Sequence, residues 1–123
     1  LSHKVSLNNI RGNIRFTNMK RQLKAHGYSN EILSLNETAF WKSIVSSYYY
    51  YHRYRHRFSQ EEQQEALYLI KYMREQIDTT LLAPSTRWRP GYWKMPSWHL
   101  FRLQEEAFFL LRRLIKKDNK ALE

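Results

Sequence analysis

Apolar residues along this chain recur mostly three or four positions apart, which is the spacing of one face of an α-helix. The first clear example is Phe16, Met19 and Leu23, followed by Gly27 at a position that suits a helix stop. This pattern predicts a helix from about Phe16 to His26. The first fifteen residues have weaker periodicity and several basic side chains, so we expect a basic arm or a short helix there.

A second helix is predicted from Ser34-Leu35-Asn36-Glu37, which matches a capping box that closes the start of a helix. It would continue to about Phe58 and bury one largely aromatic face: Phe40, Trp41, Ile44, Val45, Tyr48 and Tyr51. A strand is the competing interpretation, because Val and Tyr favour pleated surfaces. Four consecutive tyrosines at 48–51 break the alternation that a strand requires, so the helix is preferred.

The stretch Ser59-Gln60-Glu61-Glu62 is another capping box and predicts a third helix directly after the second. Three glutamates near its start also complement the helix dipole. This helix is expected to extend to the region of Pro84 and to bury the regularly spaced residues Ala66, Ile70, Met73, Ile77 and Leu81.

A last helix is predicted from Trp98 to about Lys117, with Ser97 as its N-cap. Its buried face is expected to be the stripe Leu100, Leu103, Ala107, Leu110 and Leu114, broadened by Phe101, Phe108 and Ile115. Four cations would then fall in its last turns and complement the helix dipole: Arg112, Arg113, Lys116 and Lys117.

These elements predict an all-α, four-helix bundle-like fold in one domain spanning residues 1–123. The basic arm covers residues 1–15, and a long Trp-rich loop at 84–97 precedes the last helix. Whether the helices run up and down or cross obliquely is left open by the pattern.

Net charge is the compositional feature that points to a class of binding partner. The net charge of +10, from 21 Lys and Arg against 11 Asp and Glu, implies an acidic partner such as nucleic acid, an anionic membrane surface or an acidic protein. The absence of cysteine excludes disulfides and thiolate metal sites. No apolar run reaches the roughly 18–20 residues of a membrane span, and we expect an intracellular location, cytoplasmic, nucleoid or nuclear.

The stretch 46–58 interleaves tyrosine, histidine and arginine without any acidic residue. Guanidinium groups pair with phosphates and aromatic rings stack on bases, so this composition is typical of nucleic-acid contacts. On a helix, the face opposite the buried stripe would present Tyr50, Arg53, Tyr54 and Arg57. The competing interpretation is a helix with buried tyrosine rings and arginines that reach out to water.

Two further basic segments are candidates for the same surface. The Trp-rich loop contributes Arg87, Trp88, Arg89, Trp93 and Lys94, and the first helix contributes Lys20, Arg21 and Lys24. Loops on a helical scaffold commonly carry recognition residues. Alternatively, the tryptophans of the loop fold inward and cover one end of the core.

Catalytic chemistry is weakly represented, so no enzyme activity, cofactor or metal is expected. His52 and His56 have the i, i+4 spacing of two zinc ligands, but Arg53 stands where a zinc protease needs Glu. Arg21 and His26 have the Arg-x4-His spacing of HEPN-type RNases, which are also helical bundles; a solvated basic helix end explains it equally. The carboxylate pairs lack the histidine partners of a helical di-iron site.

The sequence therefore predicts a non-catalytic nucleic-acid-binding protein, a small regulator or a subunit of a nucleoprotein assembly, on either DNA or RNA. The punctuation at 27–34, a glycine followed by Ser29, is also found in helix-turn-helix units. The main alternative is a structural or adaptor subunit that docks on an acidic protein partner, and a HEPN-like RNase is a minor one. Attachment of the Leu-Leu-Arg-Arg-Leu-Ile-Lys-Lys end to an anionic membrane is a third, disfavoured because that apolar face is expected in the core.

Overall fold

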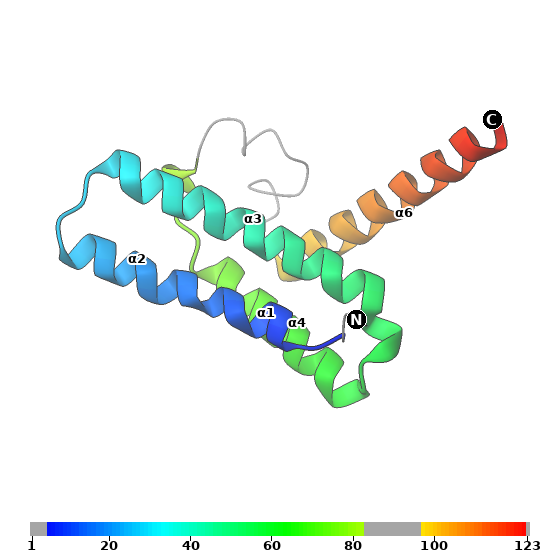
Figure 1. Cartoon of the computed structure of the whole chain (residues 1–123), viewed down its shortest axis with the longest axis horizontal. Coiled ribbons are helices and arrows are strands. Elements are labelled where there is room, and N and C mark those ends of the chain that lie inside the picture. The colour runs from blue at the N-terminus through cyan, green and yellow to red at the C-terminus, as the bar shows by residue number, and fades with distance from the viewer. Residues whose placement is uncertain (1–4, 83–96, 123) are drawn as a thin grey trace.

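Helix α3 (Asn30–Tyr54) is the central element, and every other helix packs against it (Figure 1). The computed structural model describes residues 5–82 and 97–122, with side chains up to Lys116. In these ranges the chain forms four long helices and no strand, so the predicted all-α, bundle-like single domain is confirmed. The other three are α2 (Arg15–Ala25), α4 (Gln60–Glu75) and α6 (Trp98–Leu122).

The core is built on the predicted aromatic face of α3. All six residues of that face are buried: Phe40, Trp41, Ile44, Val45, Tyr48 and Tyr51. They meet three aliphatic or sulfur side chains of α4 (Ala66, Ile70 and Met73) and two rings of α6 (Phe101 and Phe109). The helix, and not the strand, is therefore the correct interpretation of the tyrosine run.

The N-terminal residues form the short helix that was one of the two alternatives for this region. Helix α1 (Asn8–Arg11) leads through a 3-10 turn (Gly12–Ile14) into α2, and it buries Leu7 and Ile10 in the core. The Tyr50 hydroxyl fixes this segment, because it accepts hydrogen bonds from the Ser6 N–H at 3.0 Å and from Asn9 Nδ2 at 2.8 Å.

The turn between α2 and α3 depends on Gly27, whose φ of 70° lies in the left-handed region that glycine tolerates best. The Gly27 N–H bonds the Lys24 carbonyl and the Tyr28 N–H bonds the Leu23 carbonyl, which is a Schellman motif. The predicted helix stop is confirmed. The two helices run antiparallel side by side, as a helical hairpin, without the crossed geometry of a helix-turn-helix unit (Figure 1).

The predicted start of the second helix at Ser34 is wrong. Ser29 caps α3, since its side chain accepts from the Ile32 N–H, and Ser34 lies inside the helix. Glu37, assigned to the capping box, is only 1% exposed. Its Oε2 accepts from Lys20 Nζ on α2 at 2.8 Å and from the Asp78 N–H after α4, so it joins three parts of the chain.

The capping box at the start of α4 is confirmed, with both the Ser59 and the Glu62 hydrogen bonds present. The predicted end of this helix is wrong: α4 stops at Glu75, and a 3-10 turn (Thr79–Leu81) follows. Asp78 caps that turn through a 3.0 Å hydrogen bond from the Thr80 N–H. Because the Asp78 side chain accepts from a backbone N–H of the turn, it stabilises this turn in place of a longer helix. The spacing of apolar residues does not reveal such a local hydrogen bond.

Helix α6 begins as predicted, with the Ser97 hydroxyl accepting from the Leu100 N–H at 3.2 Å, but it continues to Leu122. Of its predicted buried face, Phe101 is buried and Phe108 is partly buried, but the stripe of leucines is exposed and that part of the prediction is wrong. Phe101, Glu105 and Phe109 face the bundle at 5% exposure or less, whereas Leu103 is 67% and Leu110 53% exposed. The cations at 112–117 consequently lie before the end of the helix and not in its last turn.

Candidate nucleic-acid interface

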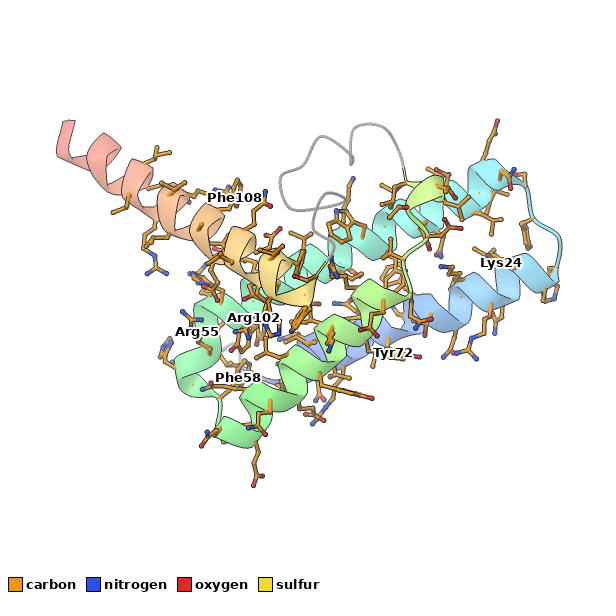
Figure 2. All side chains as sticks on the ribbon, turned by 180° about the vertical axis from the view of Figure 1, so that it is seen from behind. Lys24, Arg55, Phe58, Tyr72, Arg102 and Phe108 are labelled. Atoms are coloured by element: carbon orange, nitrogen blue, oxygen red, sulfur yellow. The ribbon has the colours of Figure 1, made fainter. Side chains whose placement is uncertain are left out.

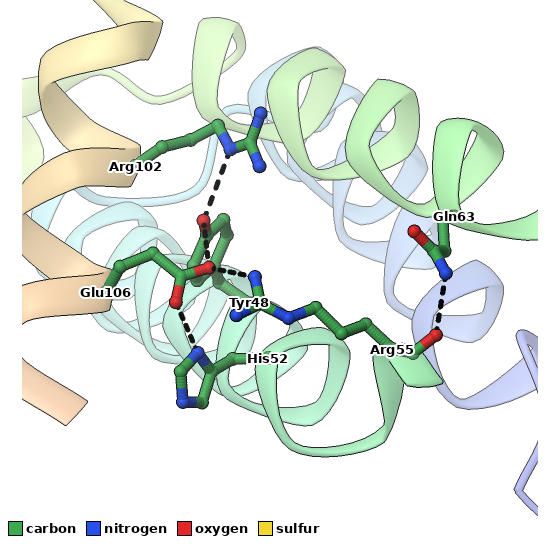
Figure 3. Close-up of polar contacts among 6 residues, drawn as sticks. All are labelled: Tyr48, His52, Arg55, Gln63, Arg102 and Glu106. Atoms are coloured by element: carbon green, nitrogen blue, oxygen red, sulfur yellow. Dashed lines mark hydrogen bonds and ion pairs between the residues drawn. The ribbon is translucent and has the colours of Figure 1, made fainter. Parts of the chain in front are cut away.

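A cluster of polar side chains joins α6 to α3 around the Glu106 carboxylate (Figure 3). Oε1 accepts from the Tyr48 hydroxyl at 3.1 Å and from Arg55 Nη1 at 2.8 Å, while Oε2 lies 2.5 Å from His52 Nδ1. Arg102 Nε donates to the Tyr48 hydroxyl at 3.2 Å. Each of these groups has a partner within the cluster. The cluster therefore positions α6 against the C-terminal end of α3.

The phenol of Tyr48 lies at the inner end of this cluster, fully buried. Burial raises its pKa from 10.0 to about 12, and the nearby Glu106 carboxylate acts in the same direction. The hydrogen bond from Arg102 opposes these effects because it favours the ionised phenolate. Tyr48 therefore remains a neutral hydrogen-bond donor across the physiological pH range.

This shift predicts an alkaline loss of stability. The folded state holds the phenol proton more tightly, so the stabilisation is fully present below pH 10.0 and is lost as the pH rises toward about 12. Urea unfolding across this pH range should show the fall in the natural protein and a shallower one in Tyr48→Phe. Tyr68→Phe removes the hydroxyl of a tyrosine that is 68% exposed, and it should keep the natural slope. Equal slopes for Tyr48→Phe and the natural protein would contradict the assignment.

Beside the cluster, α3 and α6 enclose an open groove of about 460 Å³, called here the basic groove. Helix α3 contributes Tyr49, His52 and Arg53, and α6 contributes Phe109, Arg112, Arg113 and Lys116. The Phe109 ring forms the floor, packed edge-on against Tyr49 at 5.0 Å between ring centroids. Four cations thus surround a pair of aromatic rings.

The cations of the basic groove are not neutralised within the described part of the chain. Arg53, Arg112, Arg113 and Lys116 make no ion pair there, whereas Arg11, Lys20 and Arg55 each bind a carboxylate. Arg53 lies over the Tyr54 ring and donates to the Tyr49 hydroxyl, and this hydrogen bond is the main cause of its raised pKa. Its guanidinium is held charged at the mouth of the groove.

The exposed face predicted for α3 divides around Arg53. Tyr50 and Tyr54 pack against each other, with ring centroids 4.9 Å apart, on the side of α1 and away from α6. Arg57 is exposed in the 3-10 turn that follows α3 (Arg55–Arg57) and does not line the groove. The structure thus brings only Arg53 of this predicted set into the basic groove.

The predicted residues of α2 form a separate pocket of about 400 Å³ with Tyr72 and Gln76 of the α4 end. Arg21 and Lys24 are exposed there, but Lys20 is bound to the buried Glu37. Lys24 and Arg55 lie at opposite ends of the helical bundle (Figure 2). Arg55 shares the Glu106 carboxylate with His52, which lines the basic groove, so the α2 pocket and the groove are far apart. His26, the other half of the Arg-x4-His spacing, contacts the Gln22 carbonyl through Nδ1.

The loop candidates Arg87, Trp88, Arg89, Trp93 and Lys94 lie outside the described residues. Sequence reasoning missed Tyr49, Phe109 and the three α6 cations as members of one surface. The available signal was the run of cations at 112, 113 and 116, each set opposite a leucine on the helical wheel. It was interpreted as a complement to the helix dipole because the helix was expected to end nearby.

Among the described residues, no group of three or more His, Asp or Glu side chains lies in an arrangement that could hold a metal ion. His52 is paired with Glu106, and α3 ends before His56, so the helical spacing of the two rings is lost. In the same ranges, no helix is both long and apolar enough to cross a membrane.

Fold and groove together define an all-α, bundle-like protein with an uncompensated basic surface between two helices. Comparisons of the chain with family models, curated proteins and solved structures give no significant match. The function is therefore argued from the geometry of this chain.

Proposed function

We propose that the protein is a non-catalytic nucleic-acid-binding protein, a small regulator or a subunit of a nucleoprotein assembly, and that its basic groove holds the phosphate backbone. The observation that carries the proposal is the set of four cations around the groove without a carboxylate partner in the described chain. Phosphate oxygens are matched acceptors for guanidinium groups, and three of the four cations are arginines.

The aromatic part of the groove supports a nucleic acid over a simple anion. Tyr49 is 40% exposed beside Arg53, so part of this side chain is accessible to a base while the cations contact the backbone. Of the other predicted residues, Arg21, Lys24 and Arg57 are exposed and add positive charge to the surface outside the groove.

The test is the salt dependence of binding to single- and double-stranded DNA and RNA oligonucleotides. The triple variant Arg53→Gln/Arg112→Gln/Arg113→Gln removes three cations of the groove. Since each phosphate contact contributes roughly 0.9 to the log–log salt slope on duplex DNA, we expect the slope to fall by about 2–3. The affinity at low salt should fall at least about tenfold.

The matched control removes three exposed cations elsewhere, in Arg15→Gln/Lys42→Gln/Lys71→Gln. Both variants lower the net charge of +10 by the same amount, so a general charge effect would weaken them equally. Equal losses, or binding with a flat salt response, would contradict the assignment to the groove.

The alternative partner, an acidic protein, would use the same four cations against clustered carboxylates. It does not explain the open Tyr49 ring as directly, because carboxylates offer no flat surface for stacking. Tyr49→Ala should therefore weaken oligonucleotide binding in the same assay, and an acidic peptide that outcompetes every oligonucleotide would favour the alternative.

A further inference from the structure

The apolar face of α6 that the sequence places in the core is open to solvent. Its residues, called here the leucine stripe, are Leu100, Leu103, Ala107, Leu110 and Leu114, and Leu111 and Ile115 lie beside it. The four leucines of the stripe are 45–67% exposed. An apolar patch of this length on one helix marks an interaction surface.

The spacing within the stripe indicates what kind of surface fits it. Successive positions are three, four, three and four residues apart, which is the heptad spacing of a helix that pairs with another helix. The opposite face of α6 is already buried in the bundle, because Phe101 and Phe109 pack on aromatic rings of α3 and Glu105 is only 1% exposed. One side of α6 thus packs in the bundle, and the other side exposes the leucine stripe to a second helix.

We propose that two copies of this chain associate through their leucine stripes as an antiparallel helix pair. In the register where heptad a and d positions alternate, Leu103 faces Leu114 of the second copy, and Ala107 faces Leu110. Each small residue is then opposite a large one, and the layers repeat on both sides of a twofold axis. The stripe is therefore complementary to itself, as a symmetric dimer requires.

Charge favours the antiparallel direction. Arg112, Arg113 and Lys116 lie in the C-terminal half of α6, on the side of the groove, and they have no ion-pair partner in the described chain. A parallel pair would bring the two basic segments together, and an antiparallel pair places them at opposite ends of the interface. A lipid surface would accept the leucines, but it has no requirement for the heptad spacing or for the small residue at the centre.

The interface is small. Two helices that meet over four core layers bury less than the roughly 1,600 Å² of a standard interface, so we expect a dimer that dissociates in the micromolar range. The basic groove lies between α6 and α3, on the other side of α6, and remains open in the pair. Dimerisation therefore does not depend on the proposed nucleic-acid binding.

The first experiment is sedimentation velocity of the full chain from low to high micromolar concentration, in high salt and without nucleic acid. The mass should rise from 15.1 kDa toward twice that value. Leu103→Glu/Leu110→Glu should remain monomeric, with Kd raised at least about tenfold, since both sites are exposed in the monomer. Leu35→Glu, at a 73% exposed leucine of α3, should dimerise like the natural chain.

The second experiment uses the lack of cysteine in the chain. Mixed Ala107→Cys and Leu110→Cys proteins should form a disulfide between the two variants under mild oxidation, faster than either variant alone. Rapid cross-linking of Ala107→Cys with itself would overturn the antiparallel register. A chain that stays monomeric at every concentration would overturn the proposal, as would monomers that bind phosphatidylserine vesicles through Leu110 and do not pair.

Discussion

Replacement of Lys20 by Met is expected to lower the free energy of unfolding by about 3–5 kcal/mol, the range for removing one partner of a buried ion pair. Lys20 Nζ bonds Glu37 Oε2 at 2.8 Å and the Gln76 carbonyl at 2.5 Å, and the Glu37 side chain is 1% exposed. Without the ammonium group, the carboxylate would remain in the core with only the Asp78 N–H as a donor. Urea unfolding midpoints measure the loss.

The matched control is Lys24→Met, one turn further along α2, where the side chain is exposed and the change should be within about 0.5 kcal/mol. The double variant Lys20→Met/Glu37→Leu should recover part of the loss, because it removes the uncompensated charge but still leaves the Asp78 N–H unpaired. Similar stabilities for Lys20→Met and Lys24→Met would show that Lys20 is free for other contacts, as the sequence suggested.

Truncation of Phe101 to Ala should cost about 3–5 kcal/mol as well, from lost burial and the cavity left behind. The ring is fully buried, with the centroids of Trp41, Tyr48 and Trp98 at 6.0, 5.9 and 5.8 Å. The Arg74 guanidinium lies 5.0 Å from the ring centroid. Unfolding and the near-ultraviolet circular dichroism of the tryptophans both report the change.

Leu35→Ala serves as the control for this truncation, since a 73% exposed leucine contributes little to the core. If Phe101→Ala retained the stability and the near-ultraviolet signal of the natural protein, the aromatic face of α6 would not be what attaches this helix to the bundle.

Much of the fold could be predicted because local signals and burial agree in α3 and α4. The aromatic stripe of α3 is buried throughout. Gly27 ends α2 with a left-handed backbone conformation, and Ser59 begins α4 with a side-chain capping hydrogen bond, and few residue types can do either. The predicted start of α3 is wrong because Ser29 and Ser34 both precede helical sequence and the residues after Ser34 also match a capping box. The structure decides for Ser29, because Glu37, the second residue of that capping box, is buried and bound elsewhere.

The orientation of α6 could not be predicted because both of its faces are apolar. Counting leucines favours the stripe, whereas the bundle takes Phe101 and Phe109, whose larger rings reach between the aromatic residues of α3. The basic groove was missed for the same reason: with the leucines assumed inside, Arg112 and Arg113 point away from Arg53. Periodicity shows that a helix has an apolar face, but when there are two, it does not choose between them.

The Glu106 cluster also determines the rotation of α6 about its own axis. Three donors from α3 and the turn that follows it converge on one carboxylate, and successive residues of a helix are about 100° apart around its axis. Deleting one residue between Phe101 and Glu106 would rotate these two residues by that angle relative to each other, so they could no longer both keep their contacts with α3. The leucines before and after the deletion would then lie on different sides of the helix, so the spacing between Phe101 and Glu106 sets which side of α6 faces solvent.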